Sequence, residues 1–225
     1  MTLPFIIAID GPNASGKGTL ARRLGKELGF PVLDTGLLYR AVAWMVLEKG
    51  HSLNDENAAL HCADELHTVV NDNYLDNPGL RGIDIGNAAS IVSSYPSVRQ
   101  SLFDLQRNFA LKPIDNANGS ILDGRDIGTV ICPDAAIKFF VTASPEIRAE
   151  RRAREQYGEA WESYFKEVLE KTRERDRRDS ERAVAPLKPA VDSIILDTSR
   201  VSPDEVFRQA YGLIRSRLDE HSEKK

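Results

Sequence analysis

Residues 11–19 read GPNASGKGT, and they directly follow the apolar run FIIAID of residues 5–10. A glycine-rich turn between a buried strand and a helix points its backbone N–H groups at one spot, and the helix dipole and the ammonium of Lys17 add positive charge there. This pattern is typical of a loop that binds the phosphates of a nucleotide; a plain strand-to-helix turn is the alternative, which the spacing and context disfavour. The predicted triphosphate contacts are Gly11, Pro12, Asn13, Ala14, Ser15, Gly16, Lys17, Gly18 and Thr19.

The loop departs from the common pattern in one position. A serine or threonine usually follows the lysine directly, but here Gly18 follows it and the hydroxyl comes one residue later, at Thr19. A glycine at this position lets a second substrate approach the loop. We expect Thr19 to serve Mg²⁺ either directly or through water.

Composition limits the class of protein. The chain has 225 residues, 41% of them hydrophobic and 28% charged, which is ordinary for a folded globular protein. Its net charge of −4 gives no reason to expect a nucleic-acid partner. Two separated cysteines and an N-terminus without a basic region or long apolar stretch predict a cytoplasmic protein, with neither a disulfide framework nor a membrane span.

Short apolar runs alternate along the chain with amphipathic segments. Such alternation predicts an α/β fold, in which a parallel sheet carries helices on both faces. The last helical segment opens with Ser202 as N-cap and Pro203 at the first helical position, and Glu205 completes a predicted capping box. The expected strands are residues 5–10, 31–34, 121–123, 137–142 and 194–197, and the expected helices include residues 16–28, 37–47, 145–154 and 202–218.

Four further stretches are specific as a set: LDTGLLYR (33–40), LDGRDIGTV (122–130), RERDRRDSER (173–182) and AVAPLKPA (183–190). With the GKGT loop they resemble the bacterial cytidylate kinases, over nearly the whole chain. The resemblance implies one P-loop domain with a doubly wound five-stranded parallel sheet, acting as a monomer. Its expected parts are a core (about 1–60, 90–145 and 183–225), a small monophosphate-binding insertion (about 61–89) and a short lid (about 146–182).

The resemblance also implies a reaction, the transfer of the γ-phosphoryl group of ATP to CMP or dCMP with Mg²⁺. Residues 71–87 depart from the pattern, because a longer β-rich insertion is expected there. They fit neither a helical nor a strand period, so we predict an irregular insertion. Two alternatives to a cytidylate kinase are another P-loop kinase of the UMP/CMP, adenylate or shikimate type and a module that only senses ATP.

Phosphoryl transfer brings several negative oxygens together, so converging arginines are needed. Arg40 and Arg125 follow predicted strands and should therefore lie at the carboxyl edge of the sheet, where ligands of such folds bind. By similarity both hold the CMP phosphate; surface arginines are the alternative. Lys17, Arg125, Arg148 and Arg152 are the expected catalytic residues.

Arg148, Arg151 and Arg152 fall on one face of a predicted helix. By similarity Arg148 and Arg152 are lid residues that close over the triphosphate, with Arg151 a weaker candidate and a solvated helix face the alternative. Arg175, Asp179 and Arg182 form a stripe in a charged helix, where the resemblance places ribose and phosphate contacts.

The remaining expectations concern the metal and the base. Asp123 ends an apolar strand and could hold a magnesium-bound water; Asp34 is similar, and capping or salt bridging is the alternative for both. A pocket selective for cytosine needs a carboxylate facing its amino group and a guanidinium facing its acceptors. By family match these are Asp126 with Ser90, and Arg99. The full set expected to bind CMP is Thr35, Arg40, Ser90, Arg99, Arg125, Asp126, Arg175, Asp179 and Arg182.

Overall fold

A computed structural model describes residues 4–70 and 72–222. Its described residues form a five-stranded sheet in the order β2-β3-β1-β4-β5, and every pair is parallel. This confirms the predicted α/β class, and the strand positions agree to within two residues at either end. The strands are β1 (Phe5–Asp10), β2 (Val32–Asp34), β3 (Gly119–Gly124), β4 (Ile137–Thr142) and β5 (Ile194–Asp197).

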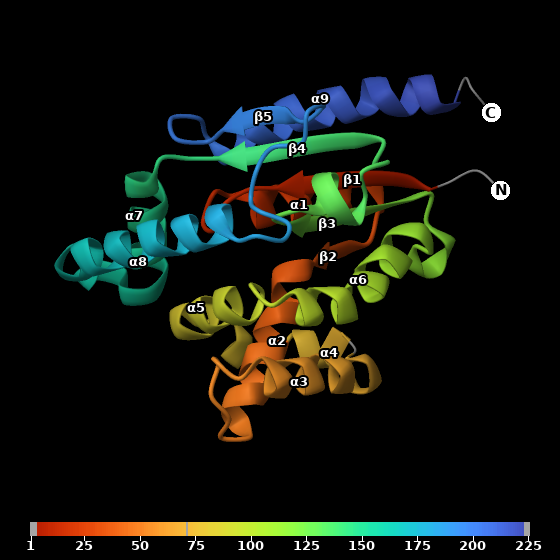
Figure 1. The fold of residues 1–225 in the computed structure, drawn as a ribbon. Helices are drawn as coiled ribbons and strands as arrows, with labels where there is room; N and C mark the ends of the chain where they lie inside the picture. Colours follow the sequence, from red (N-terminus) through yellow and green to blue (C-terminus); the bar gives the residue numbers. More distant parts are fainter. Residues whose placement is uncertain (1–3, 71, 223–225) are drawn as a thin grey trace.

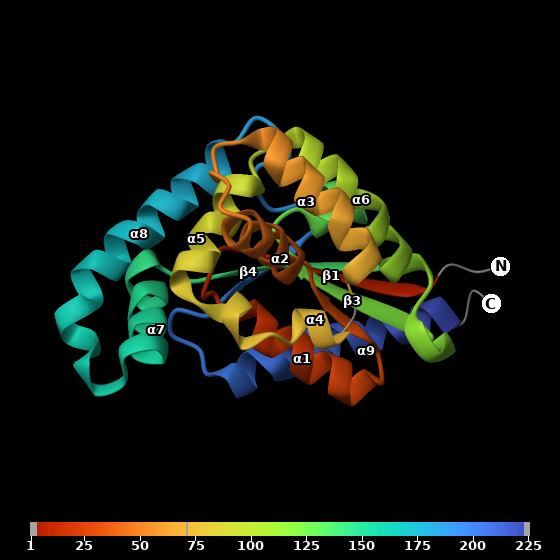
Figure 2. The same cartoon turned by 90° about the horizontal axis from the view of Figure 1, so that it is seen from below.

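Helices cover both faces of the sheet, which makes the fold doubly wound (Figure 2). On one face α1 (Lys17–Leu28) and α9 (Pro203–Ser222) pack in a core with alternate residues of β1, such as Ile7 and Ile9. On the other face α2 (Thr35–Glu48) and α6 (Pro96–Leu111) share a core with Ile6 and Ala8, and α3 (Glu56–Val69) packs on α2 and α6 in the same core. All six residues of β1 are buried, as expected for a central parallel strand.

The predicted capping box at the start of α9 is confirmed. The Ser202 hydroxyl accepts a hydrogen bond from the Glu205 N–H at 3.3 Å, and the Glu205 carboxylate accepts one from the Ser202 N–H at 2.9 Å. Two backbone donors that the helix itself leaves unpaired are thereby satisfied. These two hydrogen bonds fix the start of α9 at Pro203, directly after the loop that follows β5.

The prediction of an irregular segment at 71–87 is wrong for much of its length, although residue 71 lies outside the described residues. The segment contains α4 (Asp72–Leu75), η1 (Pro78–Arg81) and the first half of α5 (Ile83–Val92). Helix α5 packs on α2 and also contacts α8 (Trp161–Glu181), and its apolar and small residues, IDIGNAASIV, are not confined to one face. Its sequence therefore lacks the single apolar stripe by which surface helices are recognised. The described part of the insertion is helical and contains no strand.

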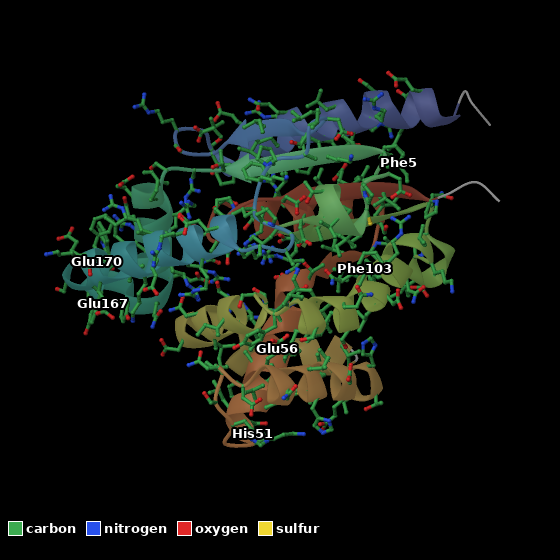
Figure 3. The ribbon with its side chains drawn as sticks, viewed as in Figure 1. Phe5, His51, Glu56, Phe103, Glu167 and Glu170 are labelled. Carbon is green, nitrogen blue, oxygen red and sulfur yellow. The ribbon has the colours of Figure 1, made fainter. Side chains whose placement is uncertain are left out.

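At the carboxyl ends of β1, β4 and β5 stands a hairpin of α7 (Pro145–Tyr157) and α8, joined by η4 (Gly158–Ala160) (Figure 1). The hairpin has a small core of its own, in which Ala149 and Ala153 of α7 meet Val168 of α8. Figure 3 shows Glu167 and Glu170 on its outer side, where both are exposed. The start of β1 and the end of α9 lie at the opposite end of the molecule (Figure 1). The short turns η2 (Ile114–Asn116) and η3 (Ile127–Ile131) complete the described elements.

Candidate functional site

The backbone of the loop of residues 11–19 requires glycine at two positions. Gly11 has φ 153°, and a Cβ there would lie 2.0 Å from the Val141 carbonyl oxygen. Gly16, with φ 89°, is left-handed and leads into α1, which begins at Lys17. The glycines thus permit the close turn from β1 into α1 that the sequence predicts. The first N–H groups of α1 and the positive end of its dipole face the loop, as an anion site requires.

Lys17 is partly buried beside the carboxylate of Asp123. Its Nζ is 3.5 Å from the Pro12 carbonyl oxygen, to which it donates, and 3.6 Å from Asp123 Oδ1. Burial lowers the pKa of Lys17 to about 8, and the charge of Arg125 acts in the same direction. Burial likewise raises the pKa of Asp123 to about 6, against the opposing charge of Lys17. An anion bound in the loop would stabilise the Lys17 ammonium directly, because its negative charge would compensate for the hydration that the ammonium loses on burial.

Gly18, which stands where a serine or threonine usually follows the lysine, is the loop residue that faces Asp123. A Cβ at Gly18 would lie 3.1 Å from Asp123 Oδ2, whereas Thr19 lines a separate cavity on the other side of α1. The two predicted metal residues, Thr19 and Asp123, therefore line different cavities. Asp123 Oδ1 is buried and has no hydrogen-bond partner among the residues described, so it remains free to accept from a metal-bound water. Asp34, the related candidate, caps α2 by accepting from the Gly36 N–H at 3.0 Å.

Asp123 alone does not make a metal cage. Over residues 4–70 and 72–222, the structure shows no group of three or more His, Cys, Asp or Glu side chains that could hold a metal ion. Mg²⁺ is commonly bound by one or two carboxylates together with substrate phosphates and water. The buried free oxygen of Asp123 next to the glycine-rich loop fits that mode.

A cavity of about 420 Å³ opens beside the glycine-rich loop. Arg151 of α7 closes one side by donating to Thr198, at 2.9 Å to its hydroxyl and 2.7 Å to its carbonyl oxygen. Thr198 in turn donates to the Ser15 carbonyl oxygen of the loop at 2.9 Å. The sequence analysis missed Thr198, although it directly follows β5 and the carboxyl-edge rule points to it. The cavity is lined by Ala14, Gly16, Thr19, Leu20, Arg23, Arg151, Glu155, Thr198, Val201, Pro203 and Val206.

On the other side of the loop lies a second pocket, which encloses only about 40 Å³. It brings together residues from five parts of the chain: α2, α5, α6, α8 and the turn after β3. Tyr39, Ala89 and Ser93 also line it and were not predicted. The residues that were expected to bind the monophosphate and that line this pocket are Thr35, Ser90, Arg99, Arg125, Asp126, Arg175, Asp179 and Arg182.

Arg40, the remaining expected residue, lies just outside that lining. Its Nη1 donates to the carbonyl oxygens of Leu80 and Gly82, at 2.7 and 2.9 Å. A Cβ at Gly86 would lie 2.9 Å from Arg40 Nη2 and 3.0 Å from Arg175 Nη1, so both guanidiniums lie against the same point of α5. Burial lowers the pKa of Arg40 to about 10 and that of Arg175 to about 9.

One end of the pocket is built around Asp126. Its carboxylate pairs with Arg99, and Arg182 Nη2 lies 3.8 Å from its other oxygen. Arg99 stacks over the ring of Tyr39, with 5.4 Å between guanidinium carbon and ring centroid. Arg182 Nη2 and the Tyr39 hydroxyl are buried, and neither has a hydrogen-bond partner among the described residues. Polar groups buried without partners are costly, and a ligand with polar edges would satisfy them.

The other end is built around Asp179. Ser90 donates to Asp179 at 2.7 Å, Arg125 Nε donates to it at 3.2 Å, and Arg175 Nε lies 3.9 Å away. Burial acts to raise the pKa of Asp179, but the charges of Arg125 and Arg175 outweigh it and hold that pKa below its usual range. Arg175 Nε has no hydrogen-bond partner within the described part of the chain. A single carboxylate facing this set of arginines leaves excess positive charge, which suits a phosphate.

The predicted lid arginines make contacts between the α7–α8 hairpin and the rest of the protein. Arg148 is buried and donates to both oxygens of Asp176, at 2.9 and 2.5 Å, and to the Asn13 carbonyl oxygen of the loop at 3.4 Å. Arg152 donates to the Arg81 carbonyl oxygen at 3.0 Å and lines a small cavity together with Asn13 and Arg175. Both therefore lie beside the glycine-rich loop.

Replacing Arg148 by methionine is expected to lower the free energy of unfolding by about 2–3 kcal/mol, because it strands the Asp176 carboxylate in a partly buried place. Urea denaturation measures this change. Arg173→Ala is the matched control, since Arg173 pairs with Glu146 across the same two helices but both side chains are more than half exposed. Its expected cost is much smaller, because solvent screens an exposed ion pair. Equal costs for the two variants would contradict a buried clamp at Arg148.

Asp10, which the sequence analysis did not single out, is a buried carboxylate close to the pocket. Its two oxygens accept hydrogen bonds from the backbone N–H groups of Ile127 and Gly128, at 2.8 and 2.7 Å. Burial raises its pKa to about 7, although these two hydrogen bonds act to lower it. A buried acid at the end of an apolar strand has no signal in the sequence beyond its position before Gly11.

This raised pKa predicts a pH dependence of stability. Between the unfolded pKa of 3.8 and the folded pKa of about 7, the native state holds a proton that the unfolded chain has lost. The stabilisation is complete below the lower value and is lost as pH rises through the higher one. Relative to Asp10→Asn, the unfolding free energy should fall by about 1.4 kcal/mol per pH unit across this window. Urea denaturation of both proteins from about pH 5 to about pH 8 tests this, and a constant difference would contradict it.

Comparisons with known proteins agree on the family. The family model described as cytidylate kinase matches residues 7–216. The chain is 53% identical over 215 residues to the cytidylate kinase of Methylocella silvestris, covering 96% of each chain. It is 50% identical over 218 residues to that of Brucella suis biovar 1, covering 97% of this chain and 96% of the relative. A crystal structure of an uncharacterized protein from Eubacterium ventriosum shares the fold, with a TM-score of 0.54, 15% identity and coverage of 94% and 99% of the two chains. The chain belongs to the cytidylate kinase family.

Proposed function

We propose that this protein transfers the γ-phosphoryl group of ATP to CMP or dCMP and releases ADP and CDP or dCDP. One observation carries the proposal. A pocket with one carboxylate at each end and arginines between them lies directly beside a loop built for a triphosphate. A kinase needs two such adjoining anion sites, whereas a protein that only senses ATP needs one.

The donor nucleotide fits the cavity beside the glycine-rich loop. At about 420 Å³ it lies within the range of small-molecule sites, and its apolar wall of Leu20, Val201 and Val206 suits a purine ring. The loop N–H groups and Lys17 receive the β- and γ-phosphates. Arg151 lies on the cavity wall, held by Thr198, so we assign it to the donor nucleotide.

The acceptor phosphate fits the cluster of Arg40, Arg125 and Arg175. Their guanidiniums lie between Asp179 and α5, and the pKa of Arg175 is lowered to about 9 because its charge is buried with too little opposite charge. Two phosphate charges would relieve that imbalance. We propose that these residues hold the CMP phosphate in line with the γ-phosphate of ATP, and that Lys17 and Arg148 and Arg152 of α7 stabilise the oxygens in transfer.

The base fits the end of the pocket formed by Asp126 and Arg99. Cytosine presents an amino donor at N4 and acceptors at N3 and O2. Asp126 can accept from N4, and the guanidinium groups of Arg99 and Arg182 can donate to the acceptor edge. Ser90 was predicted to face the base with Asp126, but it donates to Asp179 at the other end of the pocket. We therefore propose that Ser90 and Asp179 face the ribose, and that the Asp179 carboxylate accepts from the ribose hydroxyls. The 3′-hydroxyl is enough for this contact, so dCMP fits as well.

Mg²⁺ is the proposed cofactor. Asp123, with its free buried oxygen, would hold a magnesium-bound water, and Thr19 would reach the metal only if the loop or the side chain moves. When bound, the ion neutralises charge on the β- and γ-phosphates. A general base is not required, because a phosphate monoester oxygen is already largely ionised near neutral pH.

The acceptor pocket must widen before it can take a nucleotide, because its volume of about 40 Å³ is roughly a tenth of a typical ligand site. We propose that the insertion (about 61–89) and the lid (about 146–182) move apart on the core to admit CMP and close again, which excludes water from the γ-phosphate. No helix within residues 4–70 and 72–222 is long and apolar enough to cross a membrane. We infer a monomeric, cytoplasmic enzyme that acts on small molecules.

The test is a coupled assay of ADP release with ATP, Mg²⁺ and one candidate acceptor at a time. CMP and dCMP should support turnover, UMP should do so weakly, and AMP and shikimate should give only the rate of ATP alone. Turnover with AMP or shikimate and none with CMP would replace the proposal by another kinase. A rate that no acceptor changes would leave only an ATP-binding module.

A further inference from the structure

The turn η3 begins directly after Asp126, the residue proposed to read the base. An aspartate at this position, the N-cap, normally turns its carboxylate back onto the N–H groups that follow it. Asp126 makes no such hydrogen bond. Its carboxylate instead points into the pocket, where it pairs with Arg99 and lies near Arg182.

The N–H groups at the start of η3, which Asp126 leaves uncapped, donate instead to the side chain of Asp10, the last residue of β1. Ile127 and Gly128 both donate to Asp10, at 2.8 and 2.7 Å, one to each carboxylate oxygen. Asp10 is only 4% exposed and lies opposite Gly124 in the β1–β3 register. It is also the residue immediately before Gly11, where the phosphate loop begins.

We propose that Asp10 is a positioning residue that takes over the capping of η3 and so keeps the Asp126 carboxylate in the base pocket. Buried N–H groups require an acceptor, and the side chain next to them in sequence that could supply one is Asp126 itself. Without the Asp10 carboxylate, Asp126 gains from turning back to cap η3, and the base edge loses its acceptor. Asp10 thus links the start of the donor loop to the recognition of the acceptor base. This inference rests on the proposed role of Asp126.

The test is the steady-state kinetics of Asp10→Asn at about pH 8, above the raised pKa of this carboxyl. The amide has nearly the same shape but offers one acceptor and one donor, so one of the two N–H groups faces an N–H. We expect KM for CMP to rise about tenfold or more, while KM for ATP and kcat/KM for UMP stay within about threefold. A merely structural role would lower the thermal midpoint without changing the ratio of kcat/KM for CMP to that for UMP.

The matched control acts on the other end of η3. Arg107 donates to the Ile131 carbonyl oxygen at 3.1 Å and is held by two hydrogen bonds from its guanidinium to Asp134, at 2.6 and 2.8 Å. Asp134→Ala should therefore loosen the same turn without freeing its first N–H groups. We expect a lower thermal midpoint and an unchanged CMP to UMP ratio. A fall of that ratio equal to the one in Asp10→Asn would overturn the proposal.

A double-mutant cycle separates this inference from the proposed function. If Asp10 acts through Asp126, Asp10→Asn should have no further effect on the CMP to UMP ratio in an Asp126→Ala background. An Asp126→Ala variant with the native ratio would refute the assignment of Asp126 to the base, and with it the inference. A native ratio in Asp10→Asn together with a collapsed ratio in Asp126→Ala would refute the inference alone.

A structure of the native protein with CMP tests the same point if Asp10→Asn does not fold. We expect Ile127 and Gly128 still to donate to Asp10 while the Asp126 carboxylate faces the base. Hydrogen bonds from these two N–H groups to Asp126 would overturn the proposal.

Discussion

Replacing Lys17 by alanine is expected to lower kcat about a thousandfold, the size of effect found when a single preorganised charge on the transferring group is removed. The Lys17 ammonium lies in the glycine-rich loop, and its polar contacts among residues 4–70 and 72–222 are the Pro12 carbonyl oxygen and the Asp123 carboxylate, both at 3.5 Å or more. It therefore contributes little to folding and is free to follow the γ-phosphoryl group. Single-turnover kinetics with saturating ATP and CMP measure the loss.

The fold should persist in this variant, because the side chain packs in neither of the two main cores. Without the ammonium, the Asp123 carboxyl remains buried, and its pKa should rise further as its nearest opposite charge is lost. Lys26→Ala is the control, since Lys26 lies on the exposed side of the last turn of the same helix and should leave kcat unchanged. Near-normal turnover by Lys17→Ala would show that the loop does not hold the transferring phosphate.

Replacing Asp126 by asparagine is expected to remove most of the preference for CMP over UMP. In the native protein UMP would bring its O4 acceptor against the Asp126 carboxylate, two acceptors facing each other in a buried place. Such a mismatch costs about 1–3 kcal/mol, and more where one group is charged, so kcat/KM for UMP should be about a hundredfold below that for CMP. The amide can turn its NH₂ toward O4, which should reduce the difference to about tenfold or less.

Asp126→Asn will also weaken the pairing with Arg99 and Arg182, so the fold must be monitored by thermal denaturation alongside the kinetics. Asp179→Asn serves as a comparison at the other end of the same pocket. It should lower kcat/KM for CMP and for UMP together, because ribose is common to both. Equal kcat/KM values for CMP and UMP in the native protein would contradict the role of Asp126 and favour a broader pyrimidine kinase.

The sequence predicted those parts of the molecule that depend on short-range patterns. The strand FIIAID and the GKGT loop have local signatures, because a strand buried on both faces is continuously apolar and the turn needs glycines. Helix α5 was missed because its apolar and small residues are not confined to one face, so the amphipathic pattern is weak. Its helical state depends on packing partners that are distant in the sequence.

The site residues divide in the same way, into those that a short-range pattern predicts and those that depend on packing between distant parts of the chain. Arg40 and Arg125 could be placed because they follow predicted strands, and the parallel sheet brings strand ends together. Asp126 was assigned from the family resemblance. The residue-by-residue assignment of Ser90, Arg99 and Arg175 came from the family resemblance, since they lie on three different helices whose approach no local pattern encodes. Asp10 and Thr198 act through contacts to distant backbone groups, at Ile127 and Ser15, and therefore have no motif of their own. Thr19 was expected beside Asp123, but the turn of α1 places Gly18 there.

The most direct test of the account is a crystal structure of the protein with CMP and a non-hydrolysable ATP analogue. The account predicts that N4 of cytosine lies within about 3 Å of the Asp126 carboxylate, with the CMP phosphate among Arg40, Arg125 and Arg175 and the triphosphate on the loop of residues 11–19. The pocket of about 40 Å³ must then have opened around the nucleotide. CMP bound elsewhere, or bound with its base away from Asp126 and Arg99, would contradict the account.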